Sequence, residues 1–185
     1  MSKIKDILEK AKTKIQDNIL EIEHRIDITN DEKADLIIKL FSGTCAAVAI
    51  QPIPFADFFV LTPIQAYMGA RLSAIRGLNV TESQIKVLLK EIGSVIGLGL
   101  LAQQLVIGAY KTFIPFLGAL TTIPIVYGLT YAIGKTMDAY LIKKAKGLTM
   151  TKSQMKSVFE EMLKKGKREG KNNKESIKKN AKRLN

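Results

Sequence analysis

The sequence of 185 residues predicts an all-α protein built from two apolar helical hairpins that form an internal repeat. Apolar residues recur every three or four positions in the charged first segment, which is the spacing of one face of a helix. Two central stretches, residues 92–110 and 112–134, contain no charged residue. Prolines interrupt the apolar sequence at residues 52–54 and at residue 115, where helices must break. We expect an amphipathic helix before the hairpins and a helix with a basic tail after them.

Residues 1–28 form the predicted amphipathic N-terminal helix. Its apolar residues are Ile4, Leu8, Ala11, Ile15, Ile19, Ile22 and Ile26. Lys, Glu and Asp occupy most other positions, whereas a helix that lies on a membrane surface is usually basic on its polar face. The mixed charge therefore favours packing on the rest of the protein or on a partner helix. The stretch lacks the apolar core and the small-residue cleavage site of a secretory signal.

Residues 29–146 form the predicted body, in which one pattern occurs twice. Each unit begins with a threonine cap, at Thr29 and at Thr81, and continues as a helix that grows more apolar. An Ile-Pro-Phe break follows, at residues 53–55 and 114–116, and then an apolar helix that ends in basic residues. Repetition of this order predicts two equivalent hairpins.

The second hairpin has the dimensions of a membrane-spanning hairpin. A bilayer core about 30 Å thick needs about 20 apolar helical residues, and residues 92–110 and 116–134 each supply 19. Lysines flank its base, which by the positive-inside rule faces the cytoplasm together with both termini. The first hairpin, residues 36–70, is shorter and contains charged residues. Whether it spans the membrane, re-enters it or remains outside stays open.

The net charge of +12 belongs mainly to the C-terminal end. A third threonine cap, Thr151, opens an amphipathic helix expected over residues 147–165, and a basic tail expected to be disordered follows over residues 166–185. Residues 164–185 contain ten basic and two acidic residues, a net charge of +8. The candidate residues for binding lipid or a partner are Lys164, Lys165, Lys167, Arg168 and Lys171. A phosphate backbone attracts the same charge, and a solvated tail with no specific partner stays open on equal terms. Between membrane and nucleic acid, a basic tail on a nearly uncharged body favours a membrane.

The segment PIPFAD, followed by LTPIQ, is the candidate functional motif. Its candidate residues are Pro52, Pro54, Phe55, Asp57, Gln65 and Arg71. Asp57 follows the prolines, where it can cap the next helix. Gln65 and Arg71 lie about two and four turns further along that helix. These polar groups predict an interhelical network beside an apolar hairpin; a helix cap with a surface arginine is the plainer interpretation.

An enzyme is the class that the residues support least. His24 and Cys45 are the single histidine and the single cysteine, so the sequence supplies neither a nucleophile with its base nor a set of metal ligands. We expect Cys45 to be a small packing residue. We expect no catalytic residue, no cofactor and no metal ion. The low aromatic content, 6%, argues against a stacking platform for nucleic acid.

Three stretches match one family pattern: residues 33–77, which contain PIPFAD and LTPIQ, residues 81–93, and residues 129–141. They resemble the domain of unknown function family DUF697, a bacterial helical domain that is usually described as membrane-associated and that often lies beside small GTPase domains. The resemblance covers about residues 30–145 and implies an anchoring or effector role next to a GTPase. Because the chain has no GxxxxGK[ST] loop, such a GTPase would be a separate chain.

These features predict a non-enzymatic helical protein of the inner, cytoplasmic membrane, with both termini in the cytoplasm. Its expected partners are the lipid bilayer or anionic headgroups, and a GTPase in trans. A cytoplasmic helical adaptor without membrane insertion is one alternative, and a hairpin protein that permeabilises membranes is another. Homo-oligomerisation stays open.

Overall fold

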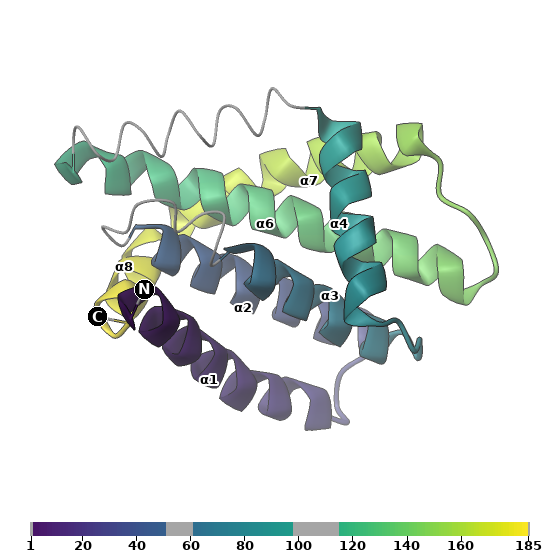
Figure 1. Cartoon of the computed structure of the whole chain (residues 1–185), viewed down its shortest axis with the longest axis horizontal. Helices are drawn as coiled ribbons and strands as arrows, with labels where there is room; N and C mark the ends of the chain where they lie inside the picture. Colours follow the sequence, from purple (N-terminus) through teal and green to yellow (C-terminus); the bar gives the residue numbers. More distant parts are fainter. Residues whose placement is uncertain (1, 51–60, 98–114, 185) are drawn as a thin grey trace.

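The structure, a computed structural model, describes residues 2–50, 61–97 and 115–184, and every regular element within these residues is a helix (Figure 1). The all-α prediction is therefore confirmed. The helices are α1 Ser2–His24, α2 Asn30–Ala49, α3 Thr62–Ile75, α4 Glu82–Ile96, α6 Pro115–Ala145, α7 Lys152–Asn172 and α8 Lys174–Lys182. Residues 51–60 and 98–114 lie outside the described residues. They contain the first predicted break, residues 53–55, and the start of the second, residues 114–116.

The three predicted threonine caps all begin helices. Thr29, Thr81 and Thr151 precede α2, α4 and α7, and each forms a capping box with the residue three positions later. At Thr29, for example, the backbone N–H donates to Glu32 Oε2 at 2.8 Å, while the backbone N–H of Glu32 donates to the threonine Oγ1 at 3.2 Å. Each box satisfies two of the N–H groups that the first helical turn leaves without a partner.

The connections from α3 to α4 and from α6 to α7 have the same backbone geometry. Gly77 and Gly147 adopt φ of 69° and 70°, in the left-handed region where a glycine avoids the steric cost of a Cβ. The next residue, Leu78 or Leu148, donates its N–H to a carbonyl five residues earlier, at 2.9 Å in both cases. A threonine cap follows each leucine after two further residues.

α6 is the central helix of the bundle (Figure 1). It packs against α7 on one side and against α2 on another, and α3 and α4 also contact it. Most of residues 122–134, which belong to a predicted membrane span, are buried in this core. Large side chains such as Ile123, Tyr131 and Met137 are fully buried there.

α1 packs on α2 through its apolar stripe. Ala11, Ile15 and Ile19 are each at most 2% exposed. The helix ends at His24, so Ile26, which the periodicity placed on the same stripe, lies in the following connection and is fully exposed. The stripe therefore covers less of the helix than the sequence indicated.

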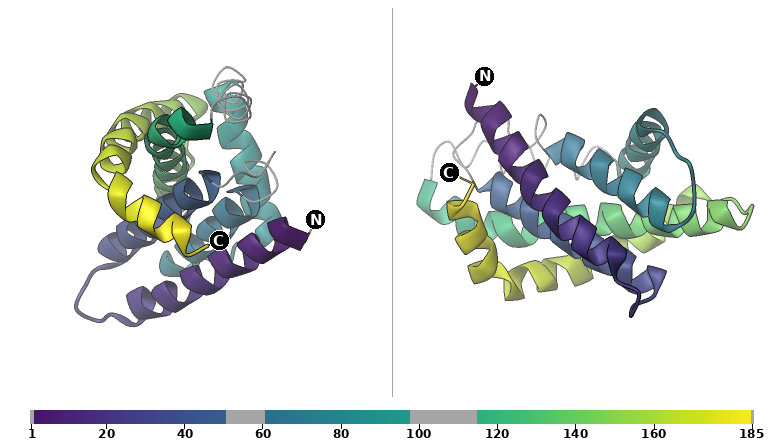
Figure 2. Two further views of the ribbon diagram at one scale, coloured as in Figure 1. Left: turned by 90° about the vertical axis from the view of Figure 1, so that its left-hand side faces the viewer. Right: turned by 90° about the horizontal axis from the view of Figure 1, so that it is seen from below.

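The segment that the sequence predicted as a disordered tail is helical in the structure. α7 continues to Asn172, and Figure 2 shows α8 turning from its end and crossing α2. Gly166 and Gly170 are buried against α6, and Ile177 and Ala181 are buried on the inner side of α8. Within each helix the two buried residues lie four positions apart, so they form one face that packs, while lysines on the other sides remain in water.

Among the helices of the described residues, none is long and apolar enough to cross a membrane. Most of the predicted span 92–110 falls within residues 98–114, which lie outside the described part of the chain.

The backbones of α6 and α7 approach each other closely at three glycines. A Cβ atom placed on Gly166 would lie 2.9 Å from the Cα atom of Gly128 and 2.9 Å from Cβ of Tyr131. A Cβ atom on Gly170 would lie 2.8 Å from Cβ of Tyr127. Real Cβ atoms do not approach other atoms this closely, so the crossing depends on the absence of side chains at these positions.

An ion-pair cluster ties the end of α3 to α6 and to the start of α2. Arg76 donates from Nε and Nη2 to the two carboxylate oxygens of Asp138, at 2.8 and 2.7 Å, and from Nη1 to Asp31 at 2.6 Å. The side chains of Arg76 and Asp138 are each only 10% exposed, whereas that of Asp31 is 81% exposed. The hydrogen bonds to Asp138, more than those to Asp31, raise the pKa of Arg76 above its usual value.

We expect the substitution Gly166→Ala to lower the free energy of unfolding by about 1–3 kcal/mol, because the added methyl group overlaps α6. Urea denaturation followed by circular dichroism measures the change. The matched control is Gly93→Ala in α4, where a Cβ atom meets nothing within 4 Å. This control should be neutral or stabilising by up to about 1 kcal/mol, because alanine has the higher helix propensity. Equal effects of the two substitutions would contradict the close crossing.

We expect Asp138→Asn to lower the free energy of unfolding by about 3 kcal/mol, because it leaves the largely buried charge of Arg76 with only an exposed partner. The control Asp31→Asn removes the other carboxylate of the same cluster and should cost less than about 1 kcal/mol, because that pair is exposed. Thermal denaturation of both variants checks the order. A larger cost at Asp31 would show that the bidentate pair does not hold α3 on α6.

Candidate functional site

The outward side of the last turns of α7 is uniformly basic. Apart from Asn172, its exposed residues from 164 onward are Lys164, Lys165, Lys167, Arg168 and Lys171, which we call the α7 basic face. Within the described residues, none of these five side chains forms an ion pair. The opposite side of the helix packs on α6 through Gly166 and Gly170. The five basic side chains therefore extend from a helix that is fixed to the core.

α8 continues the positive charge past the end of α7. Lys179 and Lys182 are exposed on it, and so is Arg183, its C-cap. Its single acid, Glu175, pairs with Lys178 at 2.9 Å. The other acid of this region, Glu169, is half-buried and accepts a hydrogen bond from the hydroxyl of Tyr127 at 3.3 Å. Both acidic side chains of this region therefore already have a partner.

A second group of charges lies on α6 and on the two helices that pack against it, α2 and α7. We call it the charged seam: Asp35, Lys39, Tyr131, Lys135 and Lys165. Asp35 Oδ2 accepts from Lys39 Nζ at 2.7 Å, and Asp35 Oδ1 lies 2.5 Å from Lys135 Nζ. The hydroxyl of Tyr131 donates to the same Oδ1 at 3.5 Å. The ammonium nitrogens of Lys135 and Lys165 lie 5.6 and 5.9 Å from the centre of the Tyr131 ring, within cation–π distance.

The seam fixes the protonation of its members. Burial raises the pKa of Asp35, but the hydrogen bonds from Lys135 and Lys39 outweigh it and hold the pKa below its usual value. Burial, and then the negative charge of Asp35, raise the pKa of Tyr131. At neutral pH the carboxylate is therefore ionised and the phenol is neutral, so the phenol can donate to the carboxylate.

Of the predicted interhelical network around the PIPFAD segment, the structure describes two members, Gln65 and Arg71. Outside the described residues lie four of its members: Pro52, Pro54, Phe55 and Asp57. Gln65 Nε2 donates to Thr130 Oγ1 of α6 at 3.2 Å. Arg71 Nε donates to Glu23 Oε1 of α1 at 2.8 Å, and its Nη2 pairs with the other oxygen of that carboxylate. Gln65 and Arg71 therefore hold different neighbouring helices, because they point to different sides of α3.

Cys45 is buried, as a small packing residue would be. Burial raises the pKa of its thiol to about 12, against a weaker opposing effect of a hydrogen bond with Thr130. A thiol with this pKa is not a nucleophile at neutral pH. In the part of the chain that the structure describes, no three His, Cys, Asp or Glu side chains gather as metal ligands.

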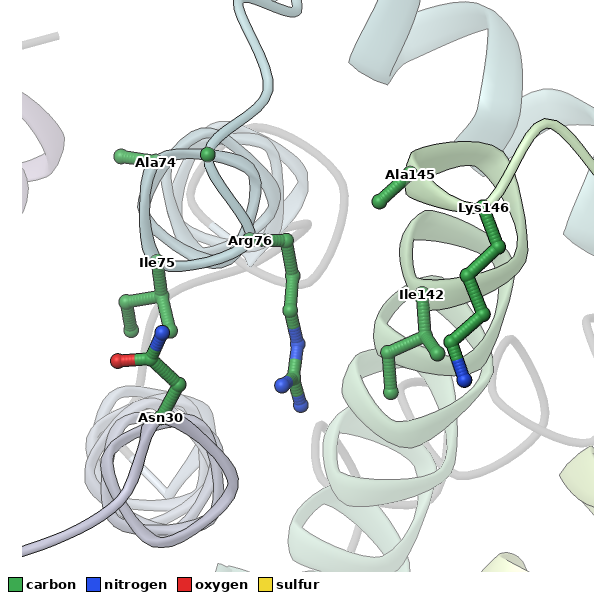
Figure 3. A pocket seen from close by; sticks show the side chains of 8 residues that line it. Asn30, Ala74, Ile75, Arg76, Ile142, Ala145 and Lys146 are labelled. Carbon is green, nitrogen blue, oxygen red and sulfur yellow. The ribbon is translucent and has the colours of Figure 1, made fainter.

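A pocket of about 390 Å³ lies where α3 and α6 end beside the start of α2 (Figure 3). Its lining residues are Asn30, Ala74, Ile75, Arg76, Gly77, Ile142, Ala145 and Lys146. The guanidinium of Arg76 lies between the two sides of the pocket in Figure 3, but it already donates to two carboxylates. The pocket therefore offers mainly apolar side chains, and its arginine has a structural role.

The sequence indicates parts of the charged seam, but it does not show that these parts lie together. Asp35 and Lys39, and Tyr131 and Lys135, are each separated by four residues, so each pair lies on one face of a helix. Lys165 has the same spacing from Glu169. Only the packing of α2, α6 and α7 brings the three pairs together.

Comparison with known families matches residues 14–168 to DUF697, described as a domain of unknown function. No curated protein and no solved structure matches the chain. The match begins within α1 and ends within α7, and it thus extends beyond residues 30–145, where the sequence resemblance lay. It includes the charged seam and most of the α7 basic face. The chain belongs to the DUF697 family.

Proposed function

We propose that the chain is a non-enzymatic, membrane-associated helical protein that binds anionic lipid headgroups through the α7 basic face. In this role it anchors, or serves as an effector of, a separate GTPase or other cytoplasmic protein. The observation that carries the proposal is the basic face itself: five exposed basic side chains on one ordered helix, none of them in an ion pair within the described residues.

The order of α7 supports this role energetically. Each Lys or Arg near an anionic leaflet contributes about 1 kcal/mol of binding. A disordered tail would lose conformational entropy on binding, whereas α7 already holds its side chains on one side. Its exposed residues from 164 to 172 include no apolar side chain. We therefore expect contact with headgroups that weakens as salt screens the charges.

The proposal includes the two apolar hairpins and an inner-membrane location with cytoplasmic termini. The matching α3–α4 and α6–α7 connections support a repeated unit, since both use a left-handed glycine and a threonine cap. The GTPase partner rests on the sequence resemblance. A cytoplasmic adaptor and a membrane-permeabilising protein are the competing functions, and the following experiment separates them.

We expect the full-length chain to sediment with vesicles of phosphatidylglycerol and phosphatidylcholine, and not with phosphatidylcholine alone. Salt at 1 M, where the Debye length is about 3 Å, should release the part of the binding that is electrostatic. The variant Lys164→Glu, Arg168→Glu, Lys171→Glu should bind at least about 100-fold more weakly, because it loses about 1 kcal/mol per basic residue and adds repulsion.

The matched control is Lys90→Glu, Lys144→Glu, Lys152→Glu, which changes the net charge equally at exposed positions off the α7 basic face. It should keep most of the binding. Equal loss in both triple variants would mean that total charge, and not this face, attracts the vesicle. Full-length protein that never sediments with anionic vesicles would support the adaptor, and dye release from them would support permeabilisation. Tighter binding to RNA than to vesicles would also contradict the proposal.

A further inference from the structure

We infer that the charged seam is a binding site for a phosphomonoester, the group that an anionic lipid such as phosphatidic acid presents in its headgroup. This inference rests on the proposed function, because it names the lipid chemistry that the α7 basic face would meet. The site lies beside that face and shares Lys165 with it.

Ammonium groups from three different helices lie around two linked side chains, Asp35 and Tyr131. Lys39 of α2 and Lys135 of α6 bind the two oxygens of one carboxylate, so they are held side by side. Lys135 and Lys165 of α7 lie within 6 Å of the centre of one phenol ring. Side chains that are fixed in this way need little further ordering to bind an anion.

The positive charge of the seam is only partly neutralised. Two carboxylates act on it: Asp35, which Lys39 and Lys135 share, and Glu169, which accepts from Tyr127 and whose charge acts on Lys39. Lys165 forms no ion pair within the described residues. The rest of the basic face adds positive charge next to it. An anion would therefore be attracted to the seam.

The chemistry of a phosphomonoester fits three separate donors. It carries a charge of about −1.5 to −2 at pH 7 and has three terminal oxygens, each able to accept a charge-assisted hydrogen bond. A phosphodiester such as phosphatidylglycerol has one charge and two such oxygens. The seam is also open to solvent, because the side chains of Asp35, Lys39 and Lys135 are 28, 42 and 22% exposed.

Asp35 is an internal competitor for the same lysines. Its carboxylate positions Lys39 and Lys135 but also neutralises part of their positive charge. Its removal should therefore act in the opposite sense to removal of a lysine. A seam with a merely structural role would lose stability in both cases and would gain no affinity in either.

The experiment compares phosphatidylcholine vesicles that contain either phosphatidic acid or phosphatidylglycerol, matched in surface charge. The wild-type chain should bind the phosphatidic acid vesicles more tightly. Lys39→Gln or Lys165→Gln should reduce that preference about fivefold each, the equivalent of about 1 kcal/mol per lysine. Asp35→Asn should increase binding to phosphatidic acid by a similar factor. Because Lys165 forms no ion pair within the described residues, its variant tests the site even where Asp35→Asn weakens the fold.

The matched control is Lys164→Gln, Arg168→Gln, which removes charge from the basic face outside the seam. It should weaken binding to both vesicles equally and leave the preference intact. Inorganic phosphate supplies the same group without a membrane: calorimetric binding that is lost in Lys165→Gln would support the site and assign it to a soluble phosphate compound. Equal binding to both lipids in the wild type, with no response to phosphate, would overturn the inference and leave headgroup binding standing. Failure to bind either vesicle would instead contradict the proposed function.

Discussion

The close crossing of α6 and α7 is the contact on which the rest of the structure depends. Because the two backbones meet at Gly128 and Gly166 without intervening side chains, α7 lies close enough to bring Lys165 over the ring of Tyr131. The same contact directs Gly166 and Gly170 of α7 toward α6 and leaves the basic side of α7 exposed.

Two charge clusters use α6 in different ways. The positive charge of Arg76 is fully paired, because its guanidinium donates to two carboxylates and its main partner is largely buried. That cluster holds helices together. Around Asp35 the positive charge exceeds the negative charge, because two ammonium groups share this one carboxylate and Lys165 adds a third at the Tyr131 ring. The side chains of Asp35, Lys39 and Lys135 are also partly open to water. A cluster of the first kind stabilises a fold, whereas one of the second kind still has capacity to bind an anion.

The proposed role joins these features. The core around α6 supplies a rigid support, and the C-terminal helices present positive charge from it without the entropic cost of ordering a tail. The seam beside them adds a place where charge is concentrated between three helices. Attraction to a membrane surface and selection of a headgroup would thus reside in neighbouring but separable residues, and an anchored partner could respond to the lipid as well as to the charge.

The amino-acid sequence by itself determined the helical class, the three threonine caps, the family, and the concentration of basic residues after residue 163. Local interactions decide these features, because a capping box involves four neighbouring residues. Tertiary packing decided the rest. The C-terminal segment is helical because Gly166, Gly170 and Ile177 gain partners on other helices, which a charge count does not register. Gln65 and Arg71 separate because each finds its partner on a different helix, and the seam exists only because α2 and α7 both pack on α6.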